Sequence, residues 1–166
     1  MFPRTIRNFN AWLDGVSYFG KVKTGTMPEL ALATQSFRGG GMDAPIDIDM
    51  GQEAMTAELV FAEHAPELLG KWGTVQRIVL RAAAQGETDF EADQLTFTLG
   101  GRITRQAPAQ FGAGSDVDLT LAMNVRTYRI EHGSNVKVDI DIEAGKRLID
   151  GVDQIASTRA ALGIGV

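Results

Sequence analysis

Apolar and polar residues alternate with a period of two in several separate stretches of this chain, and this pattern constrains its fold most strongly. The most regular example covers residues 136–143, and others cover 55–61, 95–99 and 117–125. A period of two indicates β-strands with one buried face, whereas an amphipathic helix repeats every 3.6 residues. The chain is therefore predicted to be mainly β.

Turn signals between the alternating stretches define further elements. Asp14-Gly15 is a strong hairpin signal, so residues 8–22 are predicted to form a β-hairpin. The remaining expected elements are strands that start at Met27-Pro28 and cover 46–50 and 77–84, loops at 85–93 and 106–115, and short helices at 66–72 and 153–162, with Gly163 as a C-cap.

This gives about eight strands and one or two short helices, joined by short turns that favour antiparallel pairing. An antiparallel β-barrel or sandwich is the expected closure, because it leaves few exposed strand edges. The length of 166 residues suits a single domain over residues 1–166. Near Thr127 the apolar phase slips by one residue, which predicts a bulge or a strand end that serves a different surface.

A glycine-rich loop is expected between two of these strands, at about residues 37–45. It contains three consecutive glycines, which hold neither helix nor strand well and allow positive φ angles. The following run, 46–50, alternates and predicts a half-buried strand. The loop is open to two interpretations: a mobile hairpin tip, which the residues alone favour, or an arm that orders only against another copy of the chain.

Composition excludes several classes of protein. Apolar residues make up 44% and charged residues 22%, as in globular proteins. The absence of cysteine rules out disulfides and thiolate metal sites. The net charge of -5 argues against a protein that holds duplex DNA through phosphate contacts. No apolar run approaches the ~20 residues that span a membrane, and no signal-peptide pattern follows the basic residues at the start.

No catalytic or metal-binding constellation is recognisable. His64 and His132 each stand beside a turn or a helix start, without a second histidine at ligand spacing. The acidic residues between Asp43 and Glu53 do not match a calcium-binding loop. Gly145-Lys146-Arg147 lacks the other residues of a phosphate-binding loop. We therefore expect no enzyme activity, no metal and no cofactor.

Two predicted strands carry acidic faces. Like charges two residues apart on one strand lie close together and repel, which destabilises the strand mildly. One explanation is a solvated outer face, which is the commoner case. The other is a negative wall that repels a polyanion, as a channel for DNA would need. The residues concerned are Asp47 and Asp49 on one strand, and Asp139, Asp141 and Glu143 on the other.

The glycine-rich loop also carries a family resemblance. It resembles the aromatic-Arg-Gly-x-Gly-Met stretch of the major tail tube proteins of P2-like contractile-tail phages, including the proline-centred strand entry that follows at 44–47. Weaker similarities lie at Leu13-Asp14-Gly15 and at 150–164, and the three occur in the family's order. The matching loop residues are Phe37, Arg38, Gly39, Gly40, Gly41 and Met42.

The resemblance implies a β-barrel or sandwich protomer that forms hexameric rings. The rings stack into a hollow tube inside a contractile sheath, and the tube passes DNA or pierces a target envelope. The implied partners are further copies of the chain, the tail sheath, tape-measure and baseplate proteins, and DNA only as passing cargo. The implied location is the virion tail, after assembly in the bacterial host cytoplasm. The loop at 37–42 becomes the contact between subunits or rings, and the acidic faces become candidates for the lumen wall.

Two other hypotheses remain open at this stage. One is the secreted tube protein of type VI systems, which shares the general fold. The other is a small β-barrel that binds a ligand in a cavity lined by Trp12, Phe97 and Tyr128, although the sequence supplies no convergent polar set for such a ligand.

Overall fold

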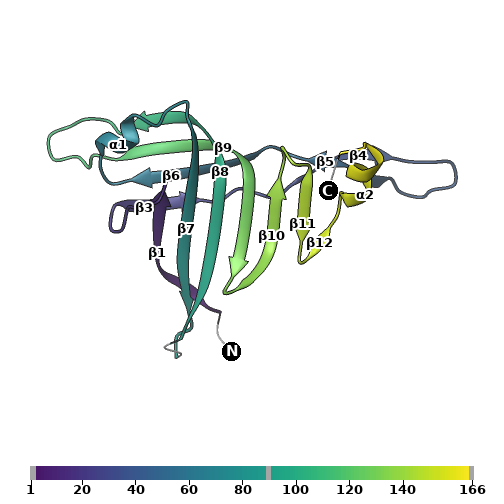
Figure 1. Cartoon of the computed structure of the whole chain (residues 1–166), viewed down its shortest axis with the longest axis horizontal. Helices are drawn as coiled ribbons and strands as arrows, with labels where there is room; N and C mark the ends of the chain where they lie inside the picture. Colours follow the sequence, from purple (N-terminus) through teal and green to yellow (C-terminus); the bar gives the residue numbers. More distant parts are fainter. Residues whose placement is uncertain (1–2, 89–90, 165–166) are drawn as a thin grey trace.

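The computed structural model describes residues 3–88 and 91–164 and is mainly antiparallel β, as predicted. Ten of its strands belong to one sheet, and two more form a separate ribbon (Figure 1). The elements are β1 (Thr5–Leu13), β2 (Val16–Ser17), β3 (Val22–Thr26), β4 (Leu32–Phe37), β5 (Ile46–Gln52), β6 (Met55–Phe61), α1 (Pro66–Leu69), β7 (Val75–Gln85), β8 (Ala92–Pro108), β9 (Leu119–His132), β10 (Asn135–Asp141), β11 (Lys146–Ile149), β12 (Val152–Asp153) and α2 (Ala156–Ala161).

Two long strands, β8 and β9, fold the large sheet over on itself. β8 pairs with β9 along most of its length, and their register shifts between Gly100 and Gly101. The first half of β9 pairs with β6 and the second half with β10, so a single strand serves two layers. A Cβ atom on Gly101 would lie 2.0 Å from the backbone oxygen of Asn124, so only glycine fits where the strands bend. The bulge predicted near Thr127 is confirmed.

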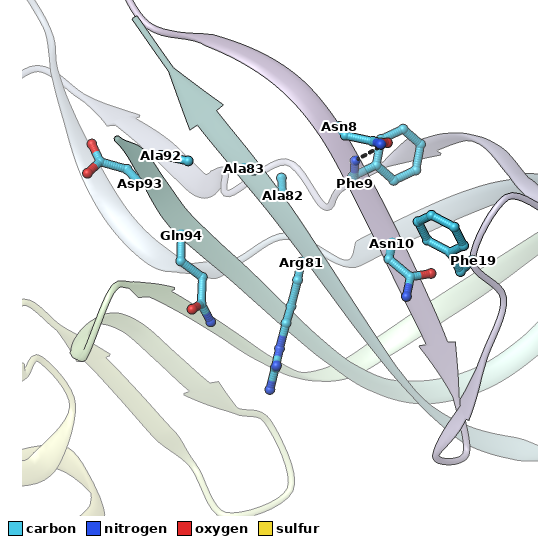
Figure 2. Close-up of a pocket in the computed structure, with 10 residues that line it drawn as sticks. All are labelled: Asn8, Phe9, Asn10, Phe19, Arg81, Ala82, Ala83, Ala92, Asp93 and Gln94. Carbon is cyan, nitrogen blue, oxygen red and sulfur yellow. Dashed lines mark hydrogen bonds between the residues drawn. The ribbon is translucent and has the colours of Figure 1, made fainter. Parts of the chain in front are cut away.

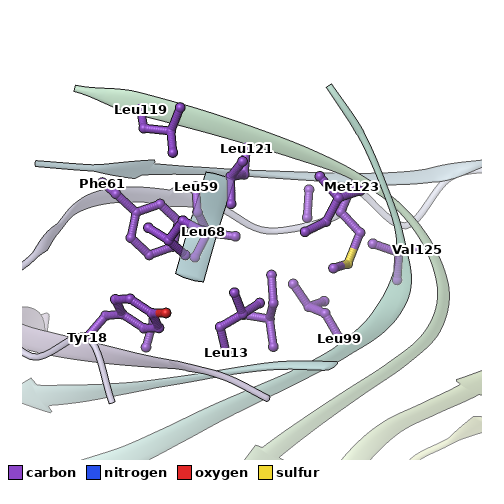
Figure 3. Close-up of a cluster of buried hydrophobic side chains, with 14 of the residues drawn as sticks. Leu13, Tyr18, Leu59, Phe61, Leu68, Leu99, Leu119, Leu121, Met123 and Val125 are labelled. Carbon is purple, nitrogen blue, oxygen red and sulfur yellow. The ribbon is translucent and has the colours of Figure 1, made fainter. Parts of the chain in front are cut away.

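The hydrophobic core lies between the two layers of the bent sheet (Figure 3). β6 and the first half of β9 supply one wall, with apolar side chains on alternate residues as their sequences predict. β1, β7 and β8 supply the opposite wall, and Leu68 of α1 packs between them. The largest fully buried side chains are Met55, Leu59, Phe61, Leu68, Ile78, Leu99, Ile103, Leu119, Leu121, Met123 and Val125.

Several predicted boundaries were wrong. The second strand of the 8–22 hairpin has only two residues, because Gly20 takes a φ of +75° and Val22 already pairs with Phe61 of β6. The strand expected from Met27 begins at Leu32. β8 extends from Ala92 to Pro108, well beyond the predicted 95–99, and it shortens both flanking loops. The centre of the predicted 85–93 loop, residues 89–90, lies outside the described residues. The short strands β11 and β12 were not predicted.

Both predicted helices are present, and both are shorter than expected. α1 begins at Pro66, but it ends before Trp72, whose side chain is exposed rather than packed on the helical face. α2 ends in a paired hydrogen-bond motif: Gly163 donates to the carbonyl of Ala160, and Ile164 donates to that of Arg159. Gly163 has a φ of +69° and fills the left-handed position after the helix, as the sequence suggested.

Candidate functional site

β4 and β5 form a two-stranded ribbon that projects beyond the large sheet at one end of the molecule's long axis (Figure 1). Its apolar side chains are exposed, so the prediction of a half-buried strand at 46–50 was wrong. An isolated two-stranded hairpin is marginally stable in water, and exposed apolar surface on it points to a partner. The exposed side chains are Leu32 (50%), Phe37 (51%), Ile46 (52%), Ile48 (44%) and Met50 (59%).

The tip of the ribbon is a compact turn that its own side chains hold. The Nε of Arg38 donates to the carbonyl of Met42 at 3.2 Å. The N–H of Gly39 meets the sulfur of Met42 at 3.2 Å, and Met42 donates back to the carbonyl of Gly39 at 3.3 Å. Gly41 has a φ of +83°, which favours glycine. The Arg-Gly-Gly-Gly-Met spacing of the sequence thus encodes one specific turn.

The base of the ribbon is anchored to the core side of β10 and β11. Asp49 forms an ion pair with Arg147 of β11 at 2.9 Å, and it accepts the N–H of Gly51 at 2.8 Å. The Gly51 N–H first, and Arg147 second, hold the pKa of the Asp49 carboxyl below its ordinary value. Arg147 pairs in register with the buried Ile140, so both side chains lie on the same face of the sheet. The anchor fixes the direction in which the ribbon leaves the body.

The predicted acidic residues do not lie together. Strand alternation places Asp139 and Asp141 on the face of β10 opposite Ile140, whereas Asp49 binds the Ile140 face through Arg147. Asp139 is paired with Lys146 at 2.7 Å, and Asp141 accepts the N–H of Ala144 at 3.0 Å. The structure therefore separates Asp47 and Asp49 on the ribbon from the acidic residues of the outer sheet face.

Basic residues to which the sequence analysis assigned no role also belong to this region. Glu143 forms an ion pair with Arg126 at 2.6 Å. Both line a hollow of about 440 Å³ on the outer sheet face, together with Arg77. Arg126 is the bulged residue of β9, and Lys146 and Arg147 open β11. A short turn joins β10 to β11. This turn could have predicted that Lys146 and Arg147 lie beside the acidic residues of β10.

The cavity proposed for a ligand-binding barrel does not form. Tyr128 is buried in the core, where desolvation raises its pKa to about 12. Phe97 packs against the same core, but Trp12 lies on the opposite face of its sheet and stacks against Arg81, with 5.3 Å from the guanidinium to the ring centroid. These three side chains therefore line no common cavity, and this alternative was wrong.

Within residues 3–88 and 91–164, no group of three or more acidic or histidine side chains is placed to hold a metal ion. His64 lies against the carbonyl of Asp118 at 3.0 Å, and His132 lies 3.6 Å from Asp93. Both histidines thus have structural partners. None of the described helices is long and apolar enough to cross a membrane. The ribbon and the charged outer sheet face are the candidate functional surfaces.

Comparison with known proteins gives consistent matches along nearly the whole chain. The sequence model of the family "Phage tail tube protein FII" matches residues 3–163. The chain is 27% identical to the major tail tube protein of Serratia phage KSP20 and 24% identical to the tail tube protein of Escherichia phage P2. Both alignments cover 98% of this chain and 98% of the relative.

Solved structures share the fold at low sequence identity. A chain from the sheath–tube complex of PVC, an extracellular contractile injection system in its extended state, aligns with a TM-score of 0.62 at 10% identity. The alignment covers 79% of this chain and 93% of that chain. A chain from the baseplate of the anti-feeding prophage aligns with a TM-score of 0.52 at 15% identity, over 81% and 99% of the two chains.

Proposed function

This chain belongs to the phage tail tube protein FII family, and we propose that its copies form hexameric rings that stack into the inner tube of a contractile tail. The family is structural, so the chain is a tail tube protein of the virion and not an enzyme. The observation that carries the ring proposal is the ribbon, because its five apolar side chains remain about half exposed in the described protomer. A second copy is the simplest partner for a surface that every subunit carries.

The proposed partners extend beyond the tube itself. The solved relatives come from a sheath–tube complex and from a baseplate, which supports contact of this chain with a contractile sheath and with a baseplate. We further propose a tape-measure protein inside the growing tube and assembly in the bacterial host cytoplasm. The finished tube conducts DNA, or punctures an envelope in particles without DNA.

The ribbon tip, residues 37–42, is proposed as the arm that contacts a subunit of the next ring. Its hydrogen-bonded turn, held by Met42, presents the exposed Phe37 on a defined projection rather than on a loose loop. A preformed turn loses less conformational entropy on binding than a disordered loop, which favours stacking.

Fewer of the acidic residues remain candidates for the lumen wall. Asp139, Asp141 and Glu143 lie on the outer face of the large sheet and remain candidates for the lumen wall. Asp47 and Asp49 would have to reach a lumen from the ribbon, and the ion pair between Asp49 and Arg147 gives Asp49 a structural role. Since Lys146 and Arg126 offset two of the outer-face carboxylates, this wall is mixed in charge rather than uniformly acidic.

Negative-stain electron microscopy of the purified protein tests the proposed function. The expected result at high protein concentration is six-fold rings, or tubes with a stain-filled central channel. Compact single particles at every salt and protein concentration would contradict the ring-and-tube proposal.

A further inference from the structure

A second open apolar surface lies at the far side of the protomer from the ribbon, between β1 and β3. We name it the β1–β3 groove. It has a volume of about 230 Å³. A neighbouring hollow of about 360 Å³ shares Phe9 and Ala82 with it and contains the exposed Phe19, but polar side chains line part of that hollow (Figure 2). The lining of the groove is entirely apolar: Ile6, Phe9, Gly25, Met27, Leu80, Ala82 and Phe97.

The groove exists because the two layers of the sheet part at this end. Leu13 and Ala11 of β1 are 2% and 1% exposed, whereas Ile6 at the other end of the same strand is 60% exposed. β3 lies close to β7, since a Cβ atom on Gly25 would be 2.9 Å from the Leu80 side chain. Beyond that contact no described segment of the chain covers the apolar floor. The hydrophobic core therefore continues into an open groove.

The edge of β1 beside the groove is closed to strand pairing. The N–H groups of Phe9 and Ala11 donate to the side-chain oxygens of Asn8 and Asn10, each at 2.8 Å. A visiting strand would have to displace these side chains to reach the backbone. Apolar side chains that enter the groove need no such displacement, so the groove suits an exposed apolar surface more than a bare strand edge.

Charge also matches the ribbon to the groove. Residues 29–53 contain five carboxylates and one arginine, a net charge of -4. Arg4 and Arg7 stand beside and on the start of β1, whose Ile6 and Phe9 line the groove, and Arg4 forms an ion pair with Asp93. Arg7 then remains as a positive charge next to Ile6 at this end of the groove. Complementary charge at the rim favours encounter and orientation, and apolar contact supplies the affinity.

We infer that the strands of the β4–β5 ribbon of one copy dock in the β1–β3 groove of another copy. The ribbon points away from β1 in the same chain, so the contact must join two molecules (Figure 1). It is heterologous: each copy offers its ribbon to one neighbour and its groove to another, and such a contact propagates into a ring or a stack. The inference rests on the proposed function and adds the receiving surface.

A complementation experiment tests the docking. Ile48→Lys impairs only the ribbon, and Ile6→Lys impairs only the groove; both side chains are exposed, at 44% and 60%. Each variant alone should lose tube formation, with at least a tenfold fall in sedimenting polymer. An equimolar mixture should form a two-chain species, because intact ribbons meet intact grooves. Val117→Lys, an exposed apolar position of 47% outside both surfaces, is the matched control and should form tubes.

Cross-linking provides a second measurement if a lysine variant fails to fold. The natural chain has no cysteine, so one chain carrying Ile48→Cys and another carrying Phe19→Cys report only their mutual contact. Oxidation of the assembled mixture should give a disulfide-linked dimer, and neither chain alone should give it. If the wild type forms tubes and the lysine variants form them equally well, the docking inference is wrong and the proposed function stands. The same conclusion follows if the wild type forms tubes but the mixture of cysteine variants gives no cross-link. If the wild type forms no rings or tubes, the proposed function fails instead.

Discussion

Single residues set the bend of the large sheet, and Gly101 is the clearest case. Any side chain there would meet the backbone of Asn124 at a distance that no Cβ atom tolerates. Gly101→Ala should lower the free energy of unfolding by about 2–3 kcal/mol, the upper part of the usual range for overpacking. Gly40→Ala, with open space around the position, should change it by less than about 0.5 kcal/mol. Urea unfolding measures both, and equal effects of the two substitutions would contradict the argument.

A second residue-scale prediction concerns acid stability. The hydrogen bond from Arg159 holds the pKa of the Asp153 carboxyl below its ordinary value of 3.8, and the Ile155 N–H contributes. A lowered pKa in the folded state means that the stabilisation is complete above about pH 4 and disappears as the pH falls through the folded-state value. Asp153→Asn should therefore flatten the decline of stability below pH 4. Unfolding curves at pH 6, 4 and 3 test this, with Asp43→Asn as an exposed control.

Among the elements, the ribbon tip is predicted to matter for assembly more than for folding. The triple substitution Gly39→Ala, Gly40→Ala and Gly41→Ala should impair stacking and leave the body folded. Local strain of about 1–2 kcal/mol arises only at Gly41, where φ is positive. Gly114→Ala reproduces that strain on another loop, with a φ of +81° and open space, and should stack normally. Long tubes from the triple variant in electron micrographs would exclude the arm assignment.

At the same scale, the sequence predicts elements well where a strand has one buried face. β6, β9 and β10 followed their alternation, because burial on one side imposes the period. The ribbon kept the alternation, but its apolar side chains are about half exposed, because it contacts the large sheet only near its base. β11 and β12 escaped prediction because both are short and are held by hairpin turns and ion pairs rather than by an apolar pattern; β12 also lies at the edge of the sheet.

At the scale of the whole molecule, the ribbon and the acidic outer face of the sheet lie apart. This separation explains why the candidate site was only partly predictable from the sequence. Residue types identified the loop and the acidic strands, because these are local features. Their relative placement depends on which face of each strand points outward. The bulge at Arg126 reverses the alternation of inward and outward side chains within β9. The groove combines β1, β3, β7 and β8, so no local pattern reports it.

The last prediction concerns the charge of the channel. If the outer face of β10 lines the lumen, Asp139→Lys with Asp141→Lys should slow DNA passage severalfold, because added positive charge binds phosphates and the passing strand must break each contact. The ion pair between Asp139 and Lys146 is partly exposed, so its loss should cost about 1 kcal/mol and tubes should still form. Glu67→Lys with Glu87→Lys makes the same change in charge at exposed sites away from β10 and serves as the control. DNA release from assembled particles, followed by dye fluorescence, should slow only for the β10 variant and recover at high salt. Equal release rates for both variants would place β10 outside the lumen.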